Sequence, residues 1–309
     1  MGTPARIFLL SFLLANAFSV AKAAFPDLGV GVRPMGMGGA YIGVANDANA
    51  PLWNPAGMTQ LANRELTATY STLYAGLNAQ LFTGETDHLG YHFLSYAQPI
   101  RSAGGVLAAS WLFFDSAFYD EQTYLLSYAK RITPRISGGI GAKVLRVGIA
   151  SNAYTQADPD LANVALARTA ATVDLSLLYF LSERVQMGVT GENLLPADVG
   201  ILGTEDVPMQ WGIGFAHHSG DMLQVIDFVL RDRRVNDHRD VSVRVGIEGW
   251  LLQRQVGLRA GYNVRSITLG ASYRYGGKEQ AQLDYAFIYP LGSIVDTLGS
   301  HRIGLSIRF

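Results

Sequence analysis

Hydrophobic residues alternate with polar or glycine residues along most of the chain, and this period of two constrains the fold more than any other feature. Residues 256–263 and 266–275 place Val, Leu, Ile, Ala or Tyr at every second position, with Gly, Arg, Thr or Ser between them. Successive side chains of a β-strand point to opposite faces, so each run predicts a strand with one apolar and one polar face. The same pattern occurs in 167–181, 241–250 and 280–288. An all-β fold follows.

Pattern reading predicts about fourteen strands, with boundaries good to two to four residues. They lie near residues 64–74, 88–98, 104–114, 122–131, 136–149, 167–181, 184–193, 210–217, 222–231, 241–250, 255–263, 266–275, 280–288 and 301–309. Most are longer than the about five to six residues of an average strand and approach the length that crosses a bilayer at a tilt. Closing the sheet into a barrel pairs the backbone N–H and C=O groups of every strand edge, which lipid cannot hydrogen-bond. A transmembrane antiparallel β-barrel of about 14 strands is therefore predicted over a soluble two-sheet sandwich.

Composition agrees with a barrel and excludes several classes of function. Only 16% of the residues are charged, against about 25% in a typical soluble domain, yet no uncharged apolar stretch is long enough for a membrane-spanning helix. The formal net charge of -1 does not indicate a nucleic-acid partner. The absence of cysteine excludes a disulfide framework and a thiol nucleophile. We expect no cofactor.

The two ends of the chain carry export and assembly signals. Residues 1–23 combine Arg6, an apolar run and a small-residue cleavage site before Ala24, which indicates a secretory signal peptide. The chain ends in a predicted strand whose last residue is Phe309. A terminal aromatic of this kind resembles the signal that the assembly machinery of bacterial outer-membrane barrels recognises. We therefore expect residues 24–63 to form an N-terminal element and 64–309 to form the barrel.

The N-terminal element contains a glycine-rich stretch, "GMGGAYIGVANDANAPLWNPAG", from residue 36 to residue 57. A dinucleotide fingerprint would need a third glycine where Tyr41 stands, and no Gly-Lys-Ser/Thr phosphate loop occurs. Its glycines and Asn-Pro turn predict a compact piece of the size of a plug in a barrel lumen. We expect the gating residues of this luminal hatch to be Gly36, Gly38, Gly39, Asn46, Asp47, Trp53, Asn54 and Pro55.

The stretch "GVRPMGMGGAYIGVANDANAPLWNPAG", residues 31–57, closely resembles the hatch of the FadL-like outer-membrane proteins. These are the long-chain fatty-acid transporters and their smaller PorV/PorQ-type relatives. The resemblance implies a fourteen-stranded outer-membrane barrel, gated by a hatch, for passive passage of hydrophobic, fatty-acid-like molecules. The PorV-like branch implies an alternative, a protein-interaction barrel in type IX secretion or surface assembly, which would bind a secreted protein through the loops 150–166 and 194–209.

Two sets of lumen residues are predicted. Residues 106–114 are apolar on both strand faces, so the face of Leu107, Trp111 and Phe113 either lines a path for a hydrophobic molecule or packs against the hatch. The charged residues expected on inward faces are Asp174, Arg244, Glu248, Arg259, Arg274 and Asp284. Opposite charges across a lumen pair structurally, so we expect these to anchor the hatch rather than to form an ion-selective pore.

Enzymatic and metal sites find little support. His218 stands beside Ser219, and His301 beside Ser300, but adjacent residues of a strand point to opposite faces, so neither pair forms a base and nucleophile. We expect both pairs in turns. His88 and His92 would lie too far apart along a strand to share a metal ion. The chain is predicted not to be an enzyme and to hold no metal.

Overall fold

The computed structural model describes residue 25 and residues 29–76, 89–100, 102, 104–161, 163–233, 238–277, 279–292 and 297–309. The predicted signal peptide, residues 1–23, lies outside the described residues, as do residue 24 and residues 26–28 of the predicted hatch. Within the described ranges, no helix combines the length and the apolar character needed to cross a membrane.

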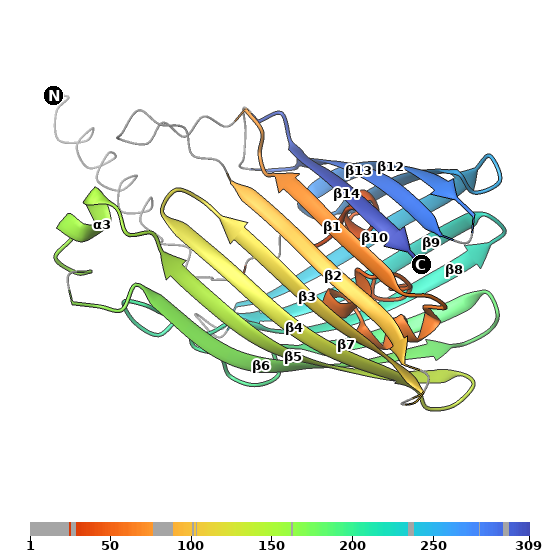
Figure 1. The fold of residues 1–309 in the computed structure, drawn as a ribbon, viewed down its shortest axis with the longest axis horizontal. Coiled ribbons are helices and arrows are strands. Elements are labelled where there is room, and N and C mark those ends of the chain that lie inside the picture. The colour runs from red at the N-terminus through yellow and green to blue at the C-terminus, as the bar shows by residue number, and fades with distance from the viewer. Residues whose placement is uncertain are drawn as a thin grey trace, which may run out of the picture.

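Fourteen strands among the described residues form one closed antiparallel barrel, in which β1 pairs with both β2 and β14 (Figure 1). The strands are β1 (Glu65–Thr72), β2 (Gly90–Ile100), β3 (Gly105–Asp115), β4 (Tyr119–Arg131), β5 (Ile136–Ile149), β6 (Ala167–Phe180), β7 (Val185–Glu192), β8 (Met209–Ser219), β9 (Met222–Arg233), β10 (His238–Leu251), β11 (Val256–Asn263), β12 (Ser266–Gly276), β13 (Gln280–Pro290) and β14 (Ser300–Arg308). The predicted strand number and antiparallel barrel are confirmed.

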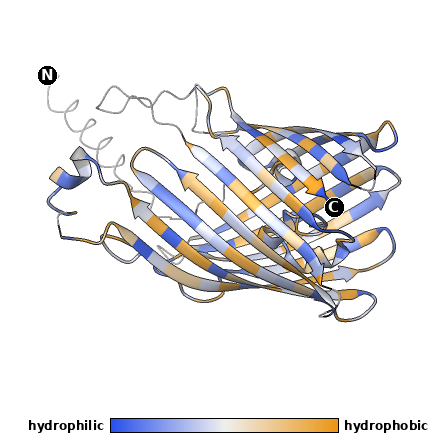
Figure 2. Ribbon diagram, viewed as in Figure 1, coloured by the Kyte–Doolittle hydropathy of each residue, from blue (hydrophilic) through white to orange (hydrophobic). Residues whose placement is uncertain are grey.

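Hydrophobic and hydrophilic residues alternate along many strands (Figure 2), and this period of two places their side chains on opposite faces of the wall. On β12, Ile267 and Leu269 are about half exposed on the outer face, whereas Thr268 between them is fully buried. Because strand pairs keep residues of one face together, the outer face is apolar around the barrel and the inner face carries small, polar and charged residues.

The two ends of the barrel differ. Tight turns such as 132–135, 181–184 and 252–255 join strands at the end where the chain terminates. The longer connections 150–166, which contains the short helix α3 (Ala153–Ala157), and 193–208 lie at the opposite end (Figure 1). We refer to these as the turn end and the loop end.

Residues 29–63, the N-terminal segment, lie inside the wall. Its short helix α2 (Val32–Gly36) packs on β11 to β14, whereas the 3-10 helix η2 (Pro55–Gln60) packs on β4, β5 and β6 across the lumen. A second 3-10 helix, η1 (Ala50–Leu52), contacts β3 and β4. The segment therefore bridges opposite sides of the barrel.

Candidate functional site

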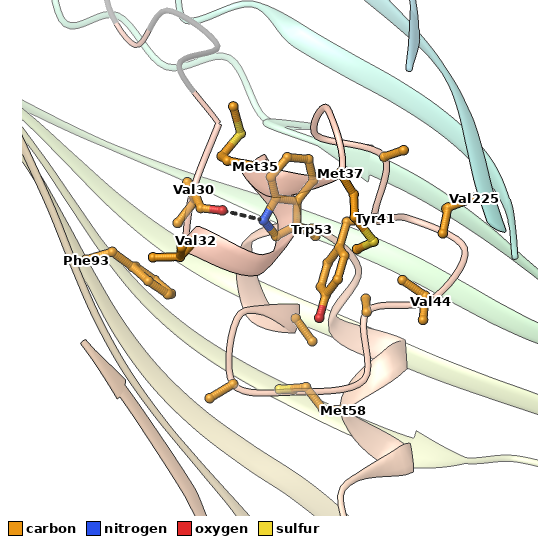
Figure 3. Close-up of a cluster of buried hydrophobic side chains, with 14 of the residues drawn as sticks. Val30, Val32, Met35, Met37, Tyr41, Val44, Trp53, Met58, Phe93 and Val225 are labelled. Carbon is orange, nitrogen blue, oxygen red and sulfur yellow. Dashed lines mark hydrogen bonds between the residues drawn. The ribbon is translucent and has the colours of Figure 1, made fainter. Parts of the chain in front are cut away.

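The N-terminal segment shares an apolar core with the barrel wall, and Trp53 lies within it (Figure 3). Tyr41 and Trp53 meet edge to face with ring centroids 6.0 Å apart, and Met37 and Met58 are fully buried nearby. The indole Nε1 of Trp53 donates a hydrogen bond of 3.2 Å to the carbonyl of Val30. Aromatic pairs of this geometry stabilise a core beyond simple burial. Trp53, predicted as a gating residue, thus belongs to the core that the segment shares with the wall.

The Asn-Pro motif both caps a helix and ties the segment to the wall. The Asn54 side chain accepts from the backbone N–H of Ala56 at the start of η2, and Pro55 occupies the first helical position, where its missing N–H costs nothing. The amide nitrogen of Asn54 donates to the carbonyls of Ile42, 2.9 Å away, and Leu177 of β6, 3.2 Å away. One side chain therefore joins two parts of the segment to the barrel.

Glycines allow the segment to approach the opposite wall backbone to backbone. Gly38 has φ +68°, and a Cβ there would lie 2.6 Å from the nitrogen of Tyr262. Facing it, a Cβ on Gly261 would lie 2.1 Å from the nitrogen of Gly38. The N–H of Gly38 donates to the hydroxyl of Thr268 at 2.9 Å, and that hydroxyl donates to the carbonyl of Gly36 at 3.1 Å. Any side chain at these positions would separate the two backbones.

A buried chain of charges joins the segment to β10, β11 and β13. The Arg33 guanidinium donates to both carboxylate oxygens of Glu248 at 2.8 Å and to Asp47 at 2.9 Å. Glu248 also pairs with Arg259 at 2.6 Å, and Arg259 reaches Asp284 at 3.1 Å. Bidentate and charge-assisted bonds of this kind are the strong ones in proteins. Three of the predicted lumen charges, Glu248, Arg259 and Asp284, thus meet in one network.

Arg33 also organises the turn that contains Asn46 and Asp47. It donates to the Asn46 side chain at 2.7 Å, and Asp47 accepts from the backbone N–H of Asn49 at 2.9 Å. Burial alone would raise the pKa of Asp47, but Arg33 and the hydrogen bonds it receives hold that pKa below its ordinary value. Burial would likewise lower the pKa of Arg33, yet Glu248 raises it above its ordinary value. Both groups are charged at neutral pH.

The other predicted lumen charges lie apart from this network. Asp174 of β6 pairs with Lys143 of β5 at 2.7 Å. Arg244 lies over the Trp53 ring at 5.6 Å and donates to the carbonyl of Gly39 at 3.3 Å. Arg274 stacks over Trp250 at 4.1 Å. Arg244 therefore holds the segment, whereas Asp174 and Arg274 belong to the wall.

The predicted inward face of β3 is wrong. Leu107 and Trp111 are more than one third exposed on the outer face, and Phe113 stacks on Trp111 on the same face. The opposite face, with Leu112 and Phe114, packs against the core of the segment. Because β3 is apolar on both faces, its pattern alone does not show which face is inward. The pairing register of β3 with β2 and β4 determines which of its faces is inward.

Sequence reasoning missed two anchors of the segment, Arg33 and Asp227. The fully buried Asp227 carboxylate accepts from the backbone N–H groups of Tyr41, 2.5 Å away, and Ile42, 2.8 Å away. A usable signal existed, because Asp227 is the one acid in the apolar run 222–230. A lone acid inside an apolar strand needs a buried partner. Arg33 lies within the N-terminal motif, residues 31–57, but it does not interrupt an apolar strand as Asp227 does, so the sequence gives no comparable signal.

The segment divides the lumen into cavities at the two ends. Two loop-end cavities of 110 and 360 Å³ adjoin Trp53 and Arg244. The smaller one is lined partly by Ile42, Leu112, Phe114 and Leu145, together with Lys143. A turn-end cavity of 380 Å³ is lined by Arg33, Asn46, Glu248, Trp250, Arg274 and Arg308. The loop-end cavities thus combine apolar with charged lining residues, whereas the turn-end cavity is richer in charged side chains.

The residues considered for catalysis lie in strands. His218 and Ser219 lie in β8, and Ser300 and His301 lie in β14, so the expectation that they occupy turns is wrong. The Ser300 hydroxyl accepts from the N–H of Tyr74, and His301 bonds with the Tyr285 hydroxyl at 2.7 Å. Among the described residues, no three His, Cys, Asp or Glu side chains gather as a metal site would require.

Comparisons with known proteins identify relatives by structure. No family model matches the sequence, and no curated protein matches it. Among solved structures, the monoaromatic hydrocarbon channel CymD superposes with a TM-score of 0.63 at 14% identity over 92% of this chain and 98% of that chain. The Pseudomonas putida toluene transporter TodX gives 0.66 at 11% over 91% and 96%, and a Pseudomonas aeruginosa FadL homologue gives 0.64 at 13% over 94% and 99%.

At these identities the similarity establishes a shared fold. The chain has the closed fourteen-stranded fold of the FadL-like proteins. The resemblance noted in its N-terminal motif is confirmed at the level of that fold. CymD is named as a channel and TodX as a transporter.

Proposed function

We propose that this protein is an outer-membrane channel for passive passage of hydrophobic, fatty-acid-like molecules, gated by its N-terminal segment. The outer wall supports membrane insertion. Leu126, Leu269 and Leu283 are each more than half exposed on that wall, and the closed ladder leaves no strand edge. Lipid is the environment in which such a surface is stable, because closure satisfies the backbone and apolar side chains match the hydrocarbon.

The orientation follows from the two ends. Barrels of the bacterial outer membrane have short turns on the periplasmic side and longer loops outside. The turn end would then face the periplasm, and the loop-end cavities would open toward the exterior. Phe309, exposed at the turn end, would be the residue recognised by the barrel assembly machinery during insertion.

The observation that carries the transport proposal is the loop-end cavity beside Trp53, part of whose lining is apolar. Leu112, Phe114 and Leu145 offer the kind of lining that hydrophobic ligands need. The fold is shared with proteins named as toluene and monoaromatic hydrocarbon transporters or channels. A hydrophobic molecule would collect in this cavity, the segment would shift, and the molecule would leave toward the periplasm or through a lateral gap. Diffusion alone would drive this passage.

The two faces of β3 provide a matched test. Leu112→Gln changes the cavity lining, and Leu107→Gln makes the same change on the outer face of the same strand. We expect Leu112→Gln to weaken retention of lauric acid or toluene by roughly tenfold, since burying one apolar side chain is worth about 1.5–3 kcal/mol. Leu107→Gln should leave retention unchanged. Native mass spectrometry of each protein extracted in mild detergent would measure the fraction that retains the ligand.

Equal retention by both variants and the unchanged protein would contradict the transport proposal. Co-purification with a secreted protein instead would favour the alternative, a PorV-like partner in type IX secretion or surface assembly. In the connection 193–208, Ala197, Val199 and Val207 are buried against β5, whereas Leu195 and Leu202 are more than half exposed. These exposed side chains, together with the connection 150–166, would provide the contact.

A further inference from the structure

Four arginines among the described residues line the turn-end cavity of 380 Å³, and three of them pair with carboxylates. The pairs are Arg33 with Glu248 at 2.8 Å, Arg308 with Glu65 at 2.9 Å and Arg254 with Asp221 at 3.5 Å. The fourth, Arg274 of β12, donates from Nε at 3.1 Å and from Nη2 at 2.8 Å to the neutral amide oxygen of Gln282. No carboxylate in the described part of the chain forms an ion pair with Arg274.

Arg274 is nevertheless held in one orientation. Its guanidinium lies over the buried Trp250 ring, 4.1 Å from the ring centroid. The Gln282 amide nitrogen donates to both oxygens of Asp284, at 2.9 and 3.0 Å, so its amide oxygen faces Arg274. Gln282 occupies the edge of the guanidinium formed by Nε and Nη2, which leaves the edge formed by Nη1 and Nη2 to a further acceptor. Neutral partners therefore fix this side chain without neutralising its charge.

The charges around Arg274 add to this positive site. Three guanidiniums act on it with the same sign of charge, those of Arg33, Arg254 and Arg308. Glu248 acts with the opposite sign, but its carboxylate is already shared by Arg33 and Arg259. Arg274 itself is partly exposed and lines the cavity. A concave surface with an excess of one charge concentrates ions of the opposite sign.

We propose that the turn-end cavity is a binding site for an oxyanion, a carboxylate or phosphate group, held by Arg274. The edge formed by Nη1 and Nη2 donates to two oxygens of the ligand, as guanidinium forks do with these groups. Trp250 and Gln282 already hold the side chain, so little rotamer freedom is lost on binding. A volume of 380 Å³ lies in the range of small-molecule sites, about 300–1,000 Å³. The cavity therefore admits an oxyanion with a short chain attached.

The test measures how fast phenylglyoxal modifies Arg274 in the full-length protein in non-ionic detergent, followed by peptide mass spectrometry. A bound oxyanion blocks this reaction, so at ten times the dissociation constant the free fraction, and with it the rate, falls about tenfold. We expect such protection from sodium phosphate and from sodium acetate. Arg135, exposed in the turn 132–135 and outside the cavity, is the internal control and should react at an unchanged rate. Sodium chloride at the same ionic strength controls for screening.

Calorimetry of variants separates the fork of Arg274 from its charge. Arg274→Gln should abolish the heat of phosphate binding, whereas Arg135→Gln, which removes an exposed guanidinium at the same end, should retain it. Arg274→Lys keeps a positive charge without the planar fork and should weaken binding by about tenfold. The protection measurement uses the unchanged protein, so it still tests the site if a variant fails to fold.

A comparison of acetate with hexanoate distinguishes two sources of the ligand. Equal protecting concentrations would indicate a small free anion, and protection by hexanoate at a lower concentration would indicate the head group of an amphiphile. Failure of both phosphate and acetate to protect Arg274 would overturn the proposal. Equal slowing at Arg274 and Arg135, or a folded Arg274→Gln protein that binds phosphate as before, would also overturn it. None of these readouts depends on transport, so this site and the transport proposal can fail separately.

Discussion

The two sides of the N-terminal segment differ in chemistry. On the loop-end side, Trp53, Leu112 and Phe114 form the apolar part of a cavity that Lys143 also lines. On the turn-end side, Arg33 and Glu248 border a cavity richer in charge, where Leu223 lies among charged side chains. A hydrophobic molecule would therefore find more apolar lining on the loop-end side. Ions and backbone contacts hold the segment, with the ions on the turn-end side, whereas apolar packing against β2 and β3 contributes on the loop-end side.

Removing the segment should erase this difference and give the largest effect. The wall closes through its own β1 and β14 ladder, so a chain lacking residues 29–57 should still insert as a barrel. We expect its single-channel conductance in planar bilayers to rise from near background to that of an open pore, because the segment fills the lumen. An unchanged conductance in a correctly folded barrel would show that the segment does not plug it.

Breaking the ionic side should release the segment without removing it. Glu248→Ala leaves Arg33 and Arg259 buried without their shared carboxylate. Loss of one partner of a buried ion pair costs about 3–5 kcal/mol, so hydrogen exchange of residues 29–63 should accelerate by roughly a hundredfold or more. Asp221→Ala removes an exposed carboxylate at the same end and should cost under about 1 kcal/mol. Equal hydrogen-exchange rates in the two variants would show that the ionic network around Glu248 does not anchor the segment.

Backbone contacts should contribute a smaller effect. Gly38→Ala places a Cβ 2.6 Å from Tyr262 at positive φ, and such strain costs about 1–3 kcal/mol. Gly203→Ala meets no atom within 4 Å and should stay within about 0.5 kcal/mol. Urea unfolding in detergent would compare the stability of the two variants. Identical urea midpoints would mean that the segment can move away from β11 without loss of stability.

The smallest effect should follow mild acidification. The pKa of Asp47 is lowered in the folded protein, so the stability it contributes is complete above its unfolded pKa of about 3.9 and is lost only as pH falls through the folded value. Between pH 7 and pH 5, hydrogen exchange of residues 29–63, corrected for intrinsic rates, should therefore not accelerate. Acceleration at pH 5 would mean that Arg33 does not keep Asp47 charged.

The sequence predicted the strands of the barrel wall more accurately than the contacts inside the lumen. Every predicted strand corresponds to an observed one, and β5 matches the predicted range 136–149, because alternation is a local property that each strand carries by itself. The face of Leu107 and Trp111 was predicted incorrectly because β3 is apolar on both sides. For Glu248 and Arg259 the inward face was clear, since their neighbours Ile247 and Leu258 are apolar and point outward.

The partners of those inward residues depend on contacts between distant parts of the chain. Arg33 and Glu248 are separated by 215 positions, and Tyr41 and Asp227 by 186. Such pairs leave no local period in a sequence. The amino-acid sequence by itself determined the all-β class, the strand number and the two-faced wall, since a strand's alternation is set residue by residue. Only the tertiary structure decided which apolar face of β3 is inward and which charges meet, because closure of the barrel brings those residues together.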